Sequence, residues 1–267
     1  MSNSLPFPTL AVILAAGQGT RMRSSLPKVM HQVGNRPLLG HVLATADAAG
    51  IEQLAVVVGP DTPAVAEYVR QAAPAAQQFI QQQRLGTAHA LLSARPALLK
   101  HEQGCVLVLF GDSPLIGAHT LERLRQTLID GAAVAVAGFT SAQPGPYGRL
   151  LTEGGRLLAI REAKDASAEE LQINLCNGGV MGFRADHCLW LLERIGNSNA
   201  QGEFYLTDAV ELANAAGLSV VAVEVAEEEI LGVNDREQLD AAEQIFQRRL
   251  RQQTLPSSHS EAPALNA

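Results

Sequence analysis

The 267-residue chain is 47% hydrophobic but only 4% aromatic, and its net charge of −7 argues against a general nucleic-acid-binding protein, whose surface is basic. Its length allows one large α/β domain, or one domain with an added lobe. Three cysteines without CxxC spacing, no secretory signal pattern and no apolar run of transmembrane length predict a cytoplasmic protein that does not bind membranes.

The first half alternates between apolar runs and helical periodicities. We predict strands at 10–14, 54–58, 77–81 and 106–110, and helices at 38–49, 63–72, 87–99 and 121–129. This alternation is typical of a parallel, doubly wound sheet. Ligands of such sheets bind beyond the carboxyl ends of the strands.

A glycine-rich segment, Leu14 to Lys28, follows the first strand. Gly17 and Gly19 allow backbone N–H groups to approach an anion, and Arg21 and Lys28 add positive charge. A dinucleotide fingerprint would need a third glycine at Met22, and a P-loop would need Gly-Lys-Ser/Thr. The segment indicates a nucleoside triphosphate site, although a glycine-rich turn with incidental basic residues is the structural alternative.

Two further segments end strands of the first half. Gln81 offers a donor and an acceptor that match the imide edge of uracil, although it also fits a polar surface run. Asp112 follows the strand at 106–110, where a carboxylate can hold Mg²⁺ on bound phosphates or cap the turn after it. Near the end of the chain, Asn234 is either a second metal ligand or the cap of the last helix.

The pattern changes near Ala132. A hairpin is predicted at 148–152 and 156–161, strands at 179–183 and 219–225, and helices at 186–195, 208–216 and 235–252. We interpret this half as a mixed-sheet substrate lobe. Three segments of this half, 146–149, 161–165 and 177–179, place polar groups beside glycines or strand ends, as a sugar-binding site requires. Each segment is equally typical of a turn or a surface ion pair. Residues 253–267 are expected to form a disordered tail.

Read in order, these segments resemble the bacterial N-acetylglucosamine-1-phosphate uridyltransferases. The resemblance runs from Leu14 to about Ala242. It is carried by Leu-Ala-Ala-Gly-x-Gly-Thr-Arg-Met with Leu-Pro-Lys, Gln-x-x-x-Leu-Gly-Thr, Gly-Asp-x-Pro-Leu-Ile, Tyr-Gly-Arg, Glu-x-Lys-Asp-Ala, Gly-Glu-x-Tyr-x-Thr-Asp and Gly-Val-Asn. Any one motif is weak, but the ordered series is specific.

The resemblance implies a Rossmann-like, doubly wound mixed sheet of the nucleotide-diphospho-sugar transferase type with a sugar-binding lobe. One nucleotidyltransferase domain is then expected over 1–252, with its nucleotide-binding half at 8–131 and its sugar-binding half and C-terminal helix at 132–252. The implied reaction joins UTP and N-acetylglucosamine-1-phosphate with the help of Mg²⁺. It yields pyrophosphate and UDP-N-acetylglucosamine, a precursor of peptidoglycan and lipopolysaccharide.

The resemblance also implies roles for individual residues. Arg21 and Lys28 are the expected catalytic residues, and Asp112 and Asn234 the expected ligands of Mg²⁺. The implied nucleotide-binding residues are Leu14, Ala15, Ala16, Gly17, Lys28, Gln81, Gly86, Thr87, Phe110, Gly111 and Asp112. The implied sugar-binding residues are Gly148, Glu162, Asn177 and Asn234.

The chain departs from the family pattern at three points. Phe110 replaces a tyrosine that often precedes Gly-Asp, and Gly178 replaces a small hydroxyl residue. No hexapeptide repeat follows Gln252, so we expect neither the acetyltransferase domain of bifunctional members nor its trimer contacts, and a monomer or weak homo-oligomer. Two alternatives stay open: another sugar-1-phosphate as substrate, such as that of N-acetylmuramic acid, or a non-catalytic nucleotide-sugar-binding module.

Overall fold

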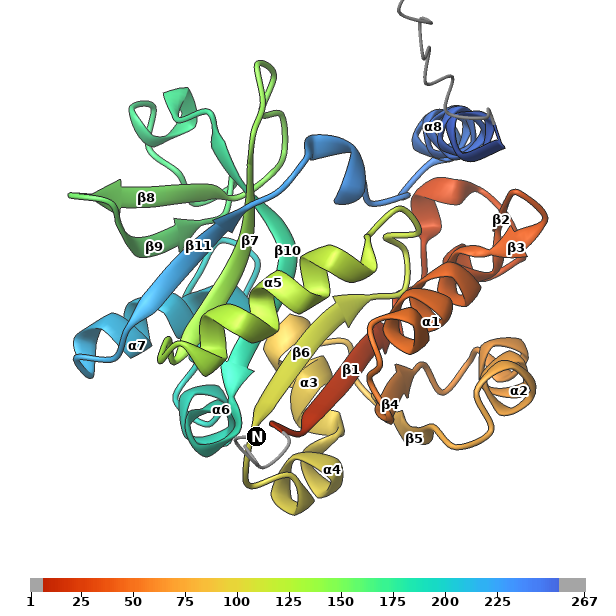
Figure 1. The fold of residues 1–267 in the computed structure, drawn as a ribbon. Coiled ribbons are helices and arrows are strands. Elements are labelled where there is room, and N and C mark those ends of the chain that lie inside the picture. The colour runs from red at the N-terminus through yellow and green to blue at the C-terminus, as the bar shows by residue number, and fades with distance from the viewer. Residues whose placement is uncertain (1–6, 255–267) are drawn as a thin grey trace, which may run out of the picture.

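A computed structural model describes residues 7–254, and within them a nine-stranded mixed sheet forms the centre of the fold (Figure 1). The strand order is β11-β7-β10-β6-β1-β4-β5, and the β8–β9 hairpin is attached at β10. The strands are β1 Thr9–Ala15, β4 Gln53–Val58, β5 Gln77–Ile80, β6 Cys105–Phe110, β7 Val134–Thr140, β8 Arg149–Glu153, β9 Arg156–Arg161, β10 Leu175–Arg184 and β11 Val220–Glu224. A separate pair, β2 Gln32–Val33 and β3 Arg36–Pro37, is antiparallel.

The direction of the strands changes between the two predicted halves. Strands β6, β1, β4 and β5 are parallel, whereas β10 runs antiparallel to both of its long neighbours, β6 and β7. The predicted mixed sheet is confirmed by this topology. Because β10 pairs with β6, one continuous sheet joins the two halves.

Helices cover both faces of the sheet. The helices are α1 Leu38–Ala48, α2 Pro63–Ala72, α3 Thr87–Ser93, α4 Arg95–Lys100, α5 Ala118–Ile129, α6 Ala185–Leu192, α7 Ala209–Ala215 and α8 Arg236–Thr254. Apolar residues of α1, α2 and α5 pack in one core cluster, and those of α3, α4, α6 and α7 pack in the other. Alternate residues of β1 contribute to the two clusters, as Ile13 and Val12 do, which explains why this strand is a continuous apolar run.

Several elements differ from the sequence prediction. Strand β7 was not predicted, and β10 begins at Leu175, four residues before the expected start. The single helix expected at 87–99 is two helices, because Pro96 lacks an N–H and its ring conflicts with a continuous turn. Helix α8 reaches Thr254, two residues into the expected tail, and the rest of that tail lies outside the described residues.

Two further observations concern the whole described chain. None of its helices between residues 7 and 254 combines the length and apolar character that crossing a membrane requires. Cys105, Cys176 and Cys188 are buried free thiols.

Candidate active site

A cavity of about 530 Å³ lies at the carboxyl ends of the parallel strands and extends over the second half of the sheet. It is lined by residues that follow β1, β5 and β6, together with residues from the β8–β10 region and from the segment before α8. All the site residues expected from the sequence line it, except Arg21 and Gly111. The structure therefore brings together side chains that are more than 200 positions apart in the chain.

Lys28 lies at the centre of one polar cluster in the cavity. Its Nζ forms an ion pair with Asp112 Oδ2 and donates a hydrogen bond of 2.9 Å to Asn234 Oδ1. The Lys28 and Asp112 side chains are only 12% and 17% exposed. Oxygens of Asp112 and Asn234, which belong to distant elements, thus meet at the Lys28 ammonium. The site is partly shielded from water, and this strengthens the electrostatic attraction between the oxygens and the ammonium.

The local structure before α8 explains why Asn234 is available. Asp235 Oδ1 accepts a hydrogen bond of 2.9 Å from the backbone N–H of Gln238, which makes Asp235 the cap of the helix. On the other side of Asn234, the Val233 N–H donates to the Asp112 carbonyl at 2.8 Å. Capping therefore falls to Asp235, and the Asn234 side chain remains free to contact Lys28.

The glycine-rich loop brings Lys28 close to the end of β1. Gly19 has a φ of +65°, and a Cβ there would lie 2.3 Å from Lys28 Cβ, so only glycine permits this approach. Gly17 has no other atom within 4 Å of a Cβ position, which leaves its backbone open to a ligand. Arg21 is exposed on a short 3₁₀ helix, Thr20–Met22, and does not line the cavity. Gly111 instead ties β6 to β1, since its N–H donates to the Leu14 carbonyl at 2.9 Å.

The predicted uracil side is formed by the loop between β5 and α3. Gln81 is buried, and its Nε2 lies 3.2 Å from the Gly86 carbonyl and 3.3 Å from His89 Nδ1. Among the described residues its amide oxygen has no partner, so it remains available as an acceptor. Thr87 is not a cap of α3: its hydroxyl accepts a hydrogen bond of 2.9 Å from Leu206 N–H and joins this loop to the second half.

The predicted sugar side lies across the cavity. Thr207 Oγ1 donates to Glu162 Oε1 at 3.0 Å, and burial raises the pKa of the Glu162 carboxyl above its usual value. Asn177 N–H donates to the Gly148 carbonyl at 2.8 Å, while Asn177 Oδ1 accepts from Gly179 N–H at 3.0 Å. The latter bond lies within a bulge of β10, which turns this part of the strand toward the cavity.

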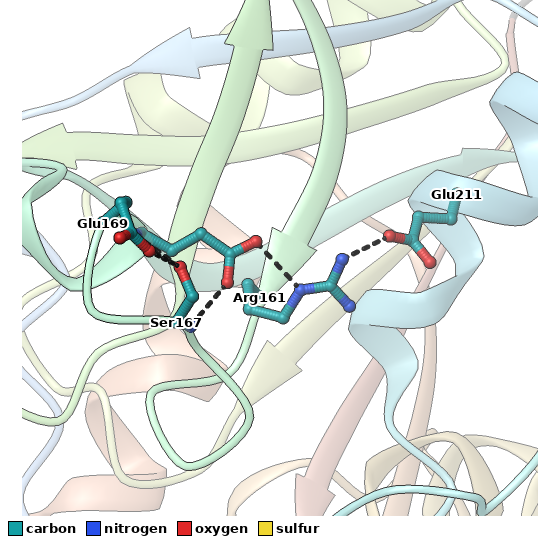
Figure 2. Close-up of polar contacts among 5 residues, drawn as sticks. Arg161, Ser167, Glu169 and Glu211 are labelled. Atoms are coloured by element: carbon teal, nitrogen blue, oxygen red, sulfur yellow. Dashed lines mark hydrogen bonds and ion pairs between the residues drawn. The ribbon is translucent and has the colours of Figure 1, made fainter.

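The segment after Glu162 is fixed by an ion-pair network that Figure 2 shows. Arg161, at the end of β9, lies between Glu170 Oε1 at 3.4 Å and Glu211 Oε1 of α7 at 2.9 Å. Glu170 Oε2 also accepts from the Ser167 N–H at 2.8 Å. Arg161 thereby links the β9–β10 connection to α7, and this restricts the position of the neighbouring Glu162.

Arg84, Tyr147, Glu203 and Ile230 are among the cavity residues that were not predicted as site residues. Tyr147 packs edge-on against Phe139 at 5.0 Å between ring centroids. Ile230 fills the space beside Gly178, where a Cβ would lie 2.6 Å from Ile230 Cδ1. Arg84 and Tyr147 lie inside motifs that were recognised in the sequence, so their position in those motifs was the available signal. No comparable signal marks Ile230.

The fold and the cavity place the protein in a known class. Residues 11–174 match the MobA-like NTP transferase domain, and the chain belongs to this family. The expectation of a nucleotidyltransferase is thereby confirmed.

Individual relatives narrow this class. The chain is 56% identical over 242 residues to the bifunctional protein GlmU of Azorhizobium caulinodans, and 57% identical over 244 residues to that of Xanthobacter autotrophicus. Each match covers 91% of this chain and 54% of the relative, so the chain spans about half the length of these relatives. The resemblance found in the ordered motifs is confirmed by these matches.

A solved structure supports the fold independently. The crystal structure of a UDP-glucose pyrophosphorylase complexed with UDP-glucose superimposes with a TM-score of 0.72 at 20% sequence identity, covering 91% of this chain and 99% of that one. At this identity the likeness concerns the fold.

Proposed function

We propose that the protein is a uridylyltransferase that makes UDP-N-acetylglucosamine and pyrophosphate from UTP and N-acetylglucosamine-1-phosphate. The observation that carries the proposal is the single cavity in which Lys28, Asp112 and Asn234 lie between the glycine-rich loop and Glu162. A nucleotide and a sugar phosphate would there share one pair of oxygen ligands and one lysine. The similarity to proteins named GlmU supports this proposal, and the likeness to a UDP-glucose pyrophosphorylase structure supports the fold on which it rests.

The proposed nucleotide half comprises the end of β1, the loop before α3 and the end of β6. Gly17 offers an open backbone to the phosphates, and the free amide oxygen of Gln81 can accept the imide proton of uracil. On the opposite side, Glu162 and Asn177 provide a carboxyl and an amide for sugar hydroxyls, with Gly148 beside them. Arg21 would contribute charge only after the loop that carries it moves toward the cavity.

The residues present fit a magnesium ion. Asp112 and Asn234 already direct one oxygen each at a single cationic atom, Lys28 Nζ, which shows that a cation is tolerated between them. Mg²⁺ is commonly held by one or two protein oxygens together with substrate phosphates and water. When bound, it neutralises negative charge on the phosphates during transfer.

In the proposed reaction, a phosphate oxygen of the sugar-1-phosphate attacks the α-phosphorus of UTP, and the bond to the departing pyrophosphate breaks. The attacking phosphate is already ionised near neutral pH, so no side chain has to remove a proton. The chain's contribution is alignment of the two substrates and neutralisation of charge by Lys28.

The experiment is a pyrophosphate-release assay with UTP, Mg²⁺ and a panel of sugar-1-phosphates. We expect turnover with the N-acetylglucosamine derivative, and a loss of about 100-fold or more in Asp112→Ala and Lys28→Ala. Lys100→Ala, at an exposed position on α4, is the control and should keep full activity. Turnover with only N-acetylmuramic acid 1-phosphate would reassign the substrate, and UTP binding without any turnover would favour a non-catalytic module.

The proposal extends to location and assembly. Buried free thiols and dependence on UTP agree with a cytoplasmic enzyme. We propose that it acts as a monomer or weak homo-oligomer, which sedimentation at several concentrations can test.

A further inference from the structure

Arg84 connects the predicted uracil loop to the glycine-rich loop. It follows β5, lines the cavity, and its Nε donates a hydrogen bond of 2.6 Å to the Ala16 carbonyl. Its Nη2 forms an ion pair with Asp61, which lies in the turn after β4. One guanidinium therefore holds three loops that leave neighbouring parallel strands at the same edge of the sheet.

The turn after β4 is shaped to admit this network. A Cβ on Gly59 would lie 2.6 Å from Arg84 Nη2, 2.9 Å from Asp61 Oδ1 and 3.3 Å from the Ala16 carbonyl oxygen. Any side chain at residue 59 would therefore occupy the space in which these groups meet. Glycine at this position is explained by the network, because the turn itself does not require it: no positive φ is recorded at Gly59.

Asp61 is held in its charged form by its partners. The hydrogen bond from Arg84 is the main reason that the pKa of the Asp61 carboxyl lies below its usual value. Gln18 Nε2, from the glycine-rich loop, lies 3.5 Å from Asp61 Oδ2. Asp61 thus contacts both Arg84 and the loop that Arg84 holds.

The bond to Ala16 has a directional consequence. The Ala16 carbonyl and the Gly17 N–H belong to one trans peptide unit, in which the C=O and N–H bonds point in opposite directions. When Arg84 fixes the carbonyl, it also fixes the direction of the Gly17 N–H. That N–H has no acceptor among the described residues, and both Ala16 and Gly17 line the cavity.

We propose that Arg84, held by Asp61, is a positioning residue that orients the Gly17 N–H toward the phosphates of the bound nucleotide. This inference rests on the proposed function, because it assigns a nucleoside triphosphate to that side of the cavity. Arg84 acts on the nucleotide half alone, since its two partners both lie at the ends of β1 and β4 and neither belongs to the sugar side.

The test compares Arg84→Ala, Arg84→Lys, Asp61→Asn and the double variant Arg84→Ala/Asp61→Asn. We expect Arg84→Ala to raise KM and Kd for UTP about 10-fold, the size of one hydrogen bond to a charged group, and to change KM for the sugar phosphate less than about twofold. Lysine cannot reproduce the fork that reaches both partners, so Arg84→Lys should stay close to Arg84→Ala. Asp61→Asn should raise KM and Kd for UTP about threefold in the wild-type background. In the Arg84→Ala background it should not change them.

Glu67→Gln is the matched control, because Glu67 and Arg70 form a comparable ion pair on exposed α2, away from the cavity. It should leave all constants unchanged. Unchanged UTP constants in a folded Arg84→Ala variant would overturn the inference, as would an equal rise in KM for both substrates or an additive effect of Asp61→Asn.

The two proposals fail separately. Absence of wild-type turnover, with UTP still bound in calorimetry, overturns the proposed reaction, and the Kd series then decides the role of Arg84. If the wild type turns over and Arg84→Ala is indistinguishable from it, only the role of Arg84 is overturned. If the wild type does not bind UTP, both are overturned.

Discussion

Gly34 and Phe246 lie so close that a methyl group on residue 34 would be 2.1 Å from Cε1 of the phenylalanine ring. The contact joins the β2–β3 hairpin to α8, which Figure 1 shows side by side, and Glu243 reinforces it by accepting from the Gly34 N–H at 2.7 Å. Since α8 directly follows Asn234, the fit at Gly34 helps to hold one end of the candidate site.

Gly34→Ala should therefore lower the free energy of unfolding by about 1–3 kcal/mol. The added methyl group overlaps the Phe246 ring, and the residue has a φ of +54°, which residues other than glycine rarely adopt. Urea unfolding measures the loss. Gly50→Ala is the control, since Gly50 has a φ of +67° but no atom within 4 Å of a Cβ position. A loss at residue 34 no greater than that at residue 50 would mean that backbone conformation, rather than Phe246, decides the cost.

The second prediction concerns competition at Lys28. One ammonium contacts both Asp112 and Asn234, so a divalent cation that uses these oxygens has to displace it. Lys28→Met should bind Mn²⁺ more tightly than the wild type without nucleotide, by about threefold or more, as measured by electron paramagnetic resonance. Lys100→Met should bind Mn²⁺ like the wild type. Weaker or unchanged Mn²⁺ binding in Lys28→Met would contradict the competition.

The third prediction concerns Gly178 and Ile230. Gly178→Ala places a methyl group 2.6 Å from Ile230 Cδ1 and 2.9 Å from the Ala137 carbonyl oxygen, and should destabilise the fold by about 1–3 kcal/mol. Ile230→Val removes the nearest of these atoms. In that background the loss should be smaller by about 0.5 kcal/mol or more, which a double-mutant cycle in urea detects. Strict additivity would show that the two residues do not share this space.

The fourth prediction concerns Asp208, at the start of α7. Burial, with Glu211, Glu162 and Asp165 nearby, raises the pKa of Asp208 to about 6, although Arg161 opposes the shift. The folded protein then holds a proton that the unfolded chain loses near pH 4, so Asp208 makes stability fall between about pH 4 and pH 6.

Asp208→Asn should remove that fall and stabilise the protein by about 1 kcal/mol more at pH 7 than at pH 4. The Asp208 side chain makes no capping hydrogen bond, so asparagine loses no contact of that kind. Urea unfolding at several pH values is the measurement, with Asp240→Asn, an exposed position on α8, as the control. A gain that is independent of pH would show that the carboxyl charge is not responsible.

The first half of the fold could be predicted because its strands are buried on both faces and separated by amphipathic helices. Strand β7, Val134–Thr140, was missed because two alanines and Gly138 dilute the strand preference of its valines and Phe139. It becomes a strand because β10 and β11 pair with it on both sides, which is information from distant parts of the chain.

In the candidate site, too, residues in local motifs could be predicted, and residues placed by distant parts of the chain could not. Residues with recognisable motifs, such as Asp112 and Asn177, line the cavity as expected. Ile230 could not be predicted, because its place depends on the space left by Gly178 and on the path of the chain before α8. Arg21 shows the converse case: its motif is clear, but the turn that carries it is exposed.

The contact between Lys28 and Asn234 joins residues that are 206 positions apart. During synthesis, the segments that carry Lys28 and Asp112 emerge long before the asparagine that completes their cluster. A ribosome-bound chain that stops short of residue 234 can therefore build most of the sheet and still lack one of its two oxygen ligands. Cation binding that appears during translation would thus report when the whole fold is complete, and not when a local motif has formed.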